Sequence, residues 1–175
     1  KGFIDMEHLK RTINEKTFLV TIMHGNNEIG TLQDLKTIGS ICSENGVRFH
    51  TDAVQSYTKA PIDVKEMHID MMSMASHKIH GPKGIGAFYL RKGLKLKSMI
   101  TGGGQERKVR GGTENVPDIV GFAKAVEIAE TSGLSELRDY MIEEVTGRIE
   151  DSFLNGPEGD DRLCNNVNIG FRYVE

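Results

Sequence analysis

The first half of the chain alternates short apolar runs with one amphipathic stretch. The run "TFLVTIM" (17–23) is rich in β-forming residues and leads into the polar sequence "HGNNEIG", which predicts a buried strand that ends in a loop. In residues 34–45 apolar side chains recur three to four positions apart and Gly46 follows, which predicts an amphipathic helix. The β-like sequence "VRFHT" (47–51) comes next. A strand, a helix and a strand in this order predict parallel pairing with a right-handed crossover.

Two further apolar runs predict a pair of neighbouring strands. "IDMMSMA" (69–75) is typical of a buried strand, and a short helical stretch is expected before it, near Val64. "GIGAFYL" (84–90) is also β-like, but the loop that joins it to the preceding run is too short for a helical crossover. We therefore expect these two strands to pair antiparallel.

Helical spacing of apolar residues marks three other segments. They are residues 5–14, 117–132 and 134–153. Pro117 lies near the start of the second segment, where a missing N–H costs little. Together the elements predict an α/β fold, with a mixed, mostly parallel sheet flanked by helices.

The composition is that of a globular domain and excludes several classes of function. The 175 residues are 38% hydrophobic and 27% charged, which suffices for one sizeable core. A net charge of -3 provides no basic field to attract nucleic acid or an anionic membrane. No apolar run approaches the roughly 20 residues that cross a bilayer, and no signal-peptide core is present, so we expect a cytoplasmic protein. Cys42 and Cys164 show no metal-ligand spacing and are expected to be unpaired.

Polar residues follow three of the predicted strands. Asn27 follows the first, Asp52 and Gln55 share a turn after the second, and Lys78 follows the third. Because ligands bind at the carboxyl ends of strands in open α/β sheets, we expect these side chains around one cleft. A carboxylate, an amide and a lysine suit a cofactor with a cationic ring nitrogen, a ring oxygen and an aldehyde. Pyridoxal phosphate has these three groups.

Each of these side chains has a chemical reason to be there. Asp52 beside the pyridine nitrogen would keep the ring protonated and a stronger electron sink. Lys78 must lose a proton to form a Schiff base, and burial with the nearby cations His77, His80 and Lys83 would favour that loss. The dianionic phosphate needs hydroxyl, imidazole and backbone N–H donors. The candidates are Ser76, His77 and Thr113.

Plainer interpretations exist for each residue taken alone. Asp52 could be a helix cap, and Lys78 could be a solvated charge, because lysine is seldom buried without a partner. The glycine-rich "TGGGQE" could be a flexible loop. The histidines show no metal-binding spacing. The order of the motifs, each placed after a strand, favours the cofactor site.

The motifs also resemble those of a known family. "MHGNNEIGTLQD", "HTDAVQS", "SHKIHGPKGIGAFYL" and "GGGQERKVRGGTENVPDIVGF" resemble the central segment of NifS/IscS-like cysteine desulfurases, class V aminotransferases of PLP fold type I. The resemblance implies that Lys78 forms the Schiff base and that Asp52 pairs with the pyridine nitrogen. It also implies that Gln55 binds the ring O3′, and that Asn27 lies beside the cofactor and the substrate carboxylate.

The same resemblance implies a reaction and an assembly. Family members remove sulfur from L-cysteine, which leaves L-alanine and an enzyme persulfide, and pass the sulfur to acceptor proteins of iron–sulfur or thiolation pathways. His77 and the hydroxyl of Ser76 would hold the phosphate. Thr113 would reach the phosphate in the other subunit of a homodimer. No nucleic-acid or membrane partner is implied.

The sequence departs from the family pattern in two ways. Neither cysteine matches the family's persulfide cysteine, so we expect a fragment that does not turn over cysteine alone. We expect residues 1–132 to belong to the large, PLP-binding domain. Residues 133–175 would then be a linking helix and the first strand of a small domain. Ala75 stands where many relatives have serine, which weakens the assignment of Ser76. The alternatives are a selenocysteine lyase, another class V PLP enzyme, or a non-catalytic interaction module with the same fold.

Overall fold

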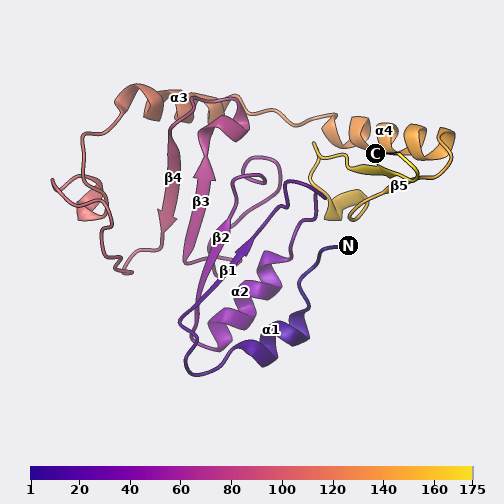
Figure 1. Cartoon of the computed structure of the whole chain (residues 1–175). Coiled ribbons are helices and arrows are strands. Elements are labelled where there is room, and N and C mark those ends of the chain that lie inside the picture. Colours follow the sequence, from indigo (N-terminus) through magenta and orange to yellow (C-terminus); the bar gives the residue numbers. More distant parts are fainter. Residues whose placement is uncertain (175) are drawn as a thin grey trace.

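The computed structural model describes residues 1–174 (Figure 1). The helices are α1 (Met6–Thr12), α2 (Leu35–Glu44), α3 (Val116–Glu127) and α4 (Leu134–Arg148). The strands are β1 (Leu19–Met23), β2 (Arg48–Asp52), β3 (Met71–Ala75), β4 (Gly86–Leu90), β5 (Ser152–Leu154) and β6 (Ile169–Phe171). Short 3-10 turns are η1 (Ser76–Ile79), η2 (Glu106–Lys108) and η3 (Gly159–Asp161). None of the helices in this part of the chain is long and apolar enough to cross a membrane.

The main sheet has four strands in the order β1-β2-β3-β4. β1 pairs parallel with β2, and β2 pairs parallel with β3, whereas β4 runs antiparallel to β3. The predicted strand-helix-strand unit and the antiparallel neighbour are both confirmed. β5 and β6 form a separate antiparallel pair near α4 (Figure 1).

Helix α2 has the boundaries that its sequence predicts. The carboxylate of Asp34 accepts a hydrogen bond of 3.0 Å from the N–H of Thr37, which satisfies one of the free donors at the helix start. Asn45 closes the other end, and Gly46 follows with a φ of +67°, a conformation that suits glycine. The apolar face of α2 packs on the sheet in a core formed by Val20, Leu35, Ile38, Cys42, Val47, Phe49, Ala53, Ile69 and Met72.

A second, smaller core holds α3 against the end of β3. Phe122 and Ala125 of α3 pack with Ile79 of η1. Asn115 caps the start of α3, where its side-chain oxygen accepts from the N–H of Asp118. This packing fixes one side of the short turn η1, which contains the candidate lysine.

Three helical predictions need correction. α3 ends at Glu127 rather than at residue 132, because the carboxylate of Glu130 accepts the N–H groups of Thr131 and Ser132 in a local turn. α4 ends at Arg148 rather than at residue 153, because residues 152–154 pair with β6. The expected helix near Val64 is only a turn.

Gly39 in α2 gives a test of the packing between this helix and the loop before β3. A Cβ at position 39 would overlap the main-chain carbonyl oxygen of Met67, which cannot move aside like a side chain. We expect Gly39→Ala to lower the free energy of unfolding by about 1–3 kcal/mol, despite the better helix propensity of alanine. In the control Gly147→Ala in α4, the added Cβ meets no atom within 4 Å, so that variant should be up to about 1 kcal/mol more stable. Urea unfolding that ranked the two variants equally would contradict the close packing.

Candidate active site

The register of the sheet brings the predicted polar residues to one edge. Met23, at the end of β1, is paired with Asp52 at the end of β2, and Asp52 is paired with Ser73 of β3. η1 starts directly after β3, so Lys78 comes just beyond the same edge. The strand order therefore places the loop with Asn27, the turn with Asp52 and the turn with Lys78 at the same edge, and the expectation that their side chains surround one cofactor stays a prediction.

Asp52 is half-buried and keeps part of its carboxylate free. Its main-chain oxygen accepts a hydrogen bond of 2.9 Å from the N–H of His24. Its Oδ1 accepts one of 2.9 Å from the N–H of Val54 two residues on, which forms a local turn and not the cap of a helix. Within residues 1–174, Oδ2 has no hydrogen-bond partner. One carboxylate oxygen is thus available to a ligand.

His50 supports the strand that ends in Asp52. Hydrogen bonds join its Nδ1 to the hydroxyl of Thr21 at 2.7 Å and its Nε2 to the hydroxyl of Ser73 at 2.9 Å. The imidazole therefore ties β1, β2 and β3 together. Burial lowers the pKa of His50, and the charge of Asp52 opposes that shift.

η1 has two buried and two exposed residues, and Lys78 is one of the exposed ones. Ser76 and Ile79 are buried and face the core, whereas His77 and Lys78 point outward. His80 ends the turn in a left-handed conformation with a φ of +65°. The ammonium of Lys78 has no hydrogen bond or ion pair to the described residues. It is therefore free to react with a ligand at this edge.

Gln55 lies in the turn after β2, and a residue that the sequence analysis did not name lies beside it. The side-chain amide of Gln55 has no partner within the described part of the chain. Its main-chain oxygen accepts a hydrogen bond of 3.0 Å from Lys59, whose ammonium also donates to the main-chain oxygen of Lys78 at 3.1 Å. These contacts are made to main-chain atoms, so no side-chain pattern in the sequence indicates them.

The three phosphate candidates are in different surroundings. Ser76 is completely buried, its hydroxyl has no partner among residues 1–174, and it lies against Gly81, so it can reach a ligand only if the turn opens. His77 is exposed beside Lys78. Thr113 is exposed in the long connection between β4 and α3, and the described residues form no hydrogen bond with its side chain. The structure thus leaves His77 and Thr113 accessible.

The loop that contains Asn27 is held from the far end of the chain. The side-chain amide of Asn166 donates to the main-chain oxygens of Asn27 at 3.3 Å and Glu28 at 2.9 Å. Asn168 donates to the oxygen of Glu28 at 3.1 Å. The side chain of Asn27 is exposed, with no partner in residues 1–174. Local sequence cannot indicate these contacts, because the partners are about 140 positions apart.

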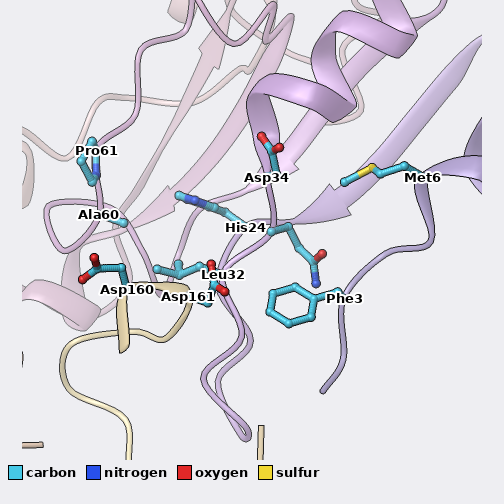
Figure 2. Close-up of a pocket in the computed structure, with 10 residues that line it drawn as sticks. Phe3, Met6, His24, Leu32, Asp34, Ala60, Pro61, Asp160 and Asp161 are labelled. Carbon is cyan, nitrogen blue, oxygen red and sulfur yellow. The ribbon is translucent and has the colours of Figure 1, made fainter. Parts of the chain in front are cut away.

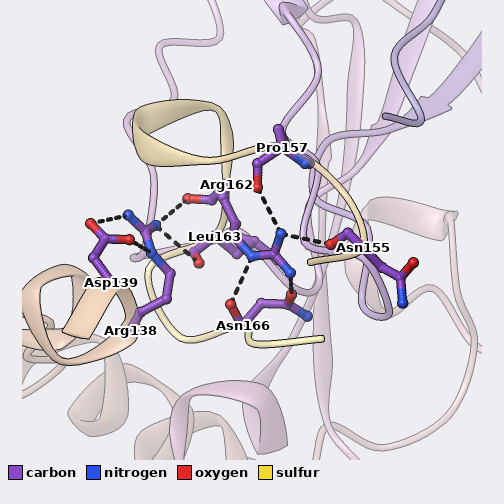
Figure 3. A network of polar contacts seen from close by, with 7 residues as sticks. All are labelled: Arg138, Asp139, Asn155, Pro157, Arg162, Leu163 and Asn166. Atoms are coloured by element: carbon purple, nitrogen blue, oxygen red, sulfur yellow. Dashed lines mark hydrogen bonds and ion pairs between the residues drawn. The ribbon is translucent and has the colours of Figure 1, made fainter. Parts of the chain in front are cut away.

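Arg162 orients Asn166 (Figure 3). Its guanidinium donates to the oxygens of Asn155 at 2.8 Å and Pro157 at 2.7 Å, and to the main-chain and side-chain oxygens of Asn166 at 2.9 Å each. Arg138 in turn donates to the main-chain oxygen of Arg162 at 2.8 Å. Arg162 is only 2% exposed, but its buried guanidinium donates four hydrogen bonds to these oxygens.

The cavity in Figure 2 adjoins this edge, because its lining includes His24, which directly follows β1. It has a volume of about 510 Å³ and contains none of the predicted cofactor residues. Its lining consists of Phe3, Met6, His24, Leu32, Gln33, Asp34, Ala60, Pro61, Asp160 and Asp161. Burial lowers the pKa of His24 to about 4, so this imidazole is neutral at pH 7.

Both cysteines are buried and unpaired, as the sequence analysis expects. Cys42 belongs to the main core, and burial raises the pKa of its thiol to about 11. A protonated, enclosed thiol is a poor nucleophile. Among the described residues, no group of three or more histidine, cysteine, aspartate or glutamate residues is arranged to hold a metal ion.

Comparison with known proteins assigns the family. Residues 1–158 match the family described as aminotransferase class-V. The chain belongs to this family. The resemblance inferred from the motifs is thereby confirmed at the level of the family.

Curated class-V relatives include cysteine desulfurases. An IscS of Dictyoglomus turgidum is 48% identical over 181 residues, and an IscS of Methanosarcina thermophila is 49% identical over 180 residues. These alignments cover 100% and 99% of this chain but 46% and 44% of the relatives. The chain spans about half the length of the curated relatives that it matches.

Solved structures confirm the fold class. The structure titled "SspA in complex with cysteine" is 40% identical with a TM-score of 0.87, over 98% of this chain and 48% of that one. A NifS-like protein is 36% identical with a TM-score of 0.92, over 99% of this chain and 49% of that one. The mixed, mostly parallel sheet flanked by helices is therefore the fold of this class-V group.

Proposed function

We propose that this chain is the cofactor-binding part of a PLP-dependent cysteine desulfurase. The reaction converts L-cysteine and an enzyme thiol into L-alanine and an enzyme persulfide. One C–S bond breaks, one S–S bond forms and no external oxidant is needed. The observation that carries the proposal is the free ammonium of Lys78, placed at the same sheet edge as the half-free carboxylate of Asp52, in a chain whose relatives are named cysteine desulfurases.

The free polar atoms at this edge fit pyridoxal phosphate, on which members of the family generally depend. Asp52 would use Oδ2 for the pyridine nitrogen, and the unpartnered amide of Gln55 would bind the ring oxygen. The exposed His77 would hold the phosphate. Ser76 stays a prediction, because its hydroxyl is enclosed. Asn27 would lie beside the cofactor and the carboxylate of the substrate.

The residues of this chain divide the chemistry between them. When bound, the cofactor supplies a cationic ring that withdraws electrons from the substrate Cα. Asp52 keeps the ring nitrogen protonated, because its negative charge favours the charged form. Lys78 would hold the cofactor covalently. The free amine of Lys78 would also move the proton of the substrate Cα.

The thiol that accepts sulfur must come from outside the described residues. Cys42 and Cys164 are both buried, and the thiol of Cys42 is protonated at neutral pH. We further propose a homodimer in which Thr113 contacts the phosphate of the partner's site, because Thr113 is exposed and its side chain forms no hydrogen bond with the described residues. A sulfur-acceptor protein and a cytoplasmic location belong to the same proposal.

The domain division is also proposed and not shown. The boundary at residue 132 falls between α3 and α4, after which the chain forms α4 and the separate β5-β6 pair.

The alternative functions share the same candidate site. A selenocysteine lyase would use the same Lys78 and Asp52. Cysteine is favoured as the substrate because one matching structure, SspA, is a complex with cysteine. A non-catalytic module with the same fold would form no covalent adduct at Lys78, so the experiment below distinguishes it from the enzyme.

Trapping the cofactor tests the proposal directly. The protein is titrated with pyridoxal phosphate, the absorbance is followed, and the adduct is reduced with borohydride and located by peptide mapping. We expect one modified lysine, Lys78. Lys83, which is exposed in the same loop region, serves as an internal control for random labelling. Labels spread over several surface lysines, or no label, would remove the structural support for the function.

A further inference from the structure

Lys59 joins the two turns that contain the candidate site. It lies after β2, is half-buried, and donates from its ammonium to the main-chain oxygens of Gln55 at 3.0 Å and Lys78 at 3.1 Å. Within residues 1–174, the bond to Lys78 is the only hydrogen bond between residues 53–60 and residues 76–81. No acidic side chain of the described residues forms an ion pair with Lys59.

A partly buried lysine without a carboxylate partner is costly and uncommon. Burial lowers the pKa of Lys59, the nearby Cys164 opposes this shift, and the charge of Lys78 lowers the pKa further. Two main-chain oxygens are the compensation that the fold provides. Hydrogen bonds to charged donors are stronger than neutral ones, so this bridge can add a polar link to two turns that are also joined by the apolar packing of Tyr57 against the cluster of Ile79.

The sheet alone does not fix Lys78. The register of β2 and β3 ends at the pair Asp52 and Ser73, and Lys78 lies five positions further along the chain. η1 has only four residues and is followed by His80 in a left-handed conformation. Packing of α3 fixes Ile79 on one side. Lys59 contacts the main chain of Lys78 from the side of the turn that contains Asp52.

We propose that Lys59 is a positioning residue, which holds the main chain of Lys78 at a set place relative to the turn of Asp52 and Gln55. The inference rests on the proposed function, because it concerns the same cofactor site. Both hydrogen bonds that Lys59 donates among the described residues go to main-chain oxygens, so its effect on the cofactor passes through Lys78. Its expected effect is on the speed and strength of covalent cofactor binding.

The test compares Lys59→Met, Lys59→Arg and the control Lys92→Met in the protein expressed from its complete gene. Lys92 is an exposed lysine that is not part of the proposed site. Adduct formation with pyridoxal phosphate is followed by stopped-flow absorbance at 15 °C, and the melting temperature is measured for each variant. For Lys59→Met we expect the rate constant at saturating cofactor to fall about tenfold and the dissociation constant to rise about tenfold. Lys59→Arg keeps the charge and the donors, so it should recover to within about threefold of wild type. Lys92→Met should match wild type.

The outcomes separate this inference from the proposed function. If the wild-type protein forms no adduct at Lys78, the proposed function fails, and the role of Lys59 fails with it. If wild type forms the adduct but Lys59→Met matches its rate and affinity, only the positioning role is overturned. It is also overturned if Lys59→Met and Lys59→Arg lose the same amount of melting temperature and of adduct, because that pattern describes a merely structural lysine.

Discussion

Replacement of Lys78 by alanine is expected to lower kcat for alanine formation from L-cysteine by about 10³-fold or more in the protein expressed from its complete gene. The loss combines the covalent anchor of the cofactor with the base that moves the proton of the substrate, and a positioned acid-base group alone contributes 10²–10⁴-fold. Stability should hardly change, because Lys78 is exposed and its side chain makes no hydrogen bond to the described residues.

Measurement of alanine release and of the melting temperature, side by side, checks this expectation. Lys92→Ala is the matched control, since Lys92 is an exposed lysine that is not part of the proposed site. It should retain wild-type activity. Substantial turnover by the Lys78→Ala protein, with its fold intact, would show that another amine does the chemistry and that the site has been placed wrongly.

Replacement of Arg162 by methionine is expected to cause the largest loss of stability, about 3–5 kcal/mol of unfolding free energy. Methionine fills part of the space but donates no hydrogen bond, so the buried oxygens of Asn155 and Pro157 lose their partner. Each unsatisfied buried polar group costs about 1–3 kcal/mol. The side chain of Asn166 would also lose its anchor, which should loosen the loop that contains Asn27.

Urea unfolding together with hydrogen exchange of residues 26–31 measures both effects. Arg148→Met is the control, because Arg148 is exposed and its one ion pair within residues 1–174 is with Glu144 on the surface of α4, where a change is worth less than about 1 kcal/mol. Faster exchange in the loop, with a stability loss confined to Arg162→Met, is the expected result. Equal stability of the two variants would mean that the buried network in Figure 3 contributes little.

The parts of the fold that the sequence predicts are those with strong local signals. α2 has an acidic cap, apolar residues at helical spacing and a glycine after its end, and all three act within one segment. The positions of Asp52 and Lys78 follow from the ends of β2 and β3, because parallel strands share an edge. The sequence alone therefore predicts that Lys78 and Asp52 lie at the same edge of the sheet.

The rest depends on contacts between distant residues. Residues 152–154 have helical spacing, but pairing with β6 makes them a strand. Lys59 is an ordinary charged residue in a turn, and only the fold shows that it reaches the main chain of Lys78. Arg162 lies in a short polar segment, where the sequence gives no sign that its guanidinium is enclosed. Such roles are properties of the packed chain and not of a motif.

The contacts of Asn166 and Asn168 also set an order of events during synthesis. The loop around Asn27 leaves the ribosome 138–140 residues before the side chains that hold it. At about 10 residues per second, this delay is on the order of 10 s, far longer than the closure of a short loop. The nascent chain can therefore assemble β1, α2 and β2 early, while the Asn27 side of the site is completed late. The loop around Asn27 therefore reaches its final hydrogen bonding only after the chain has been synthesised and folded through Asn168.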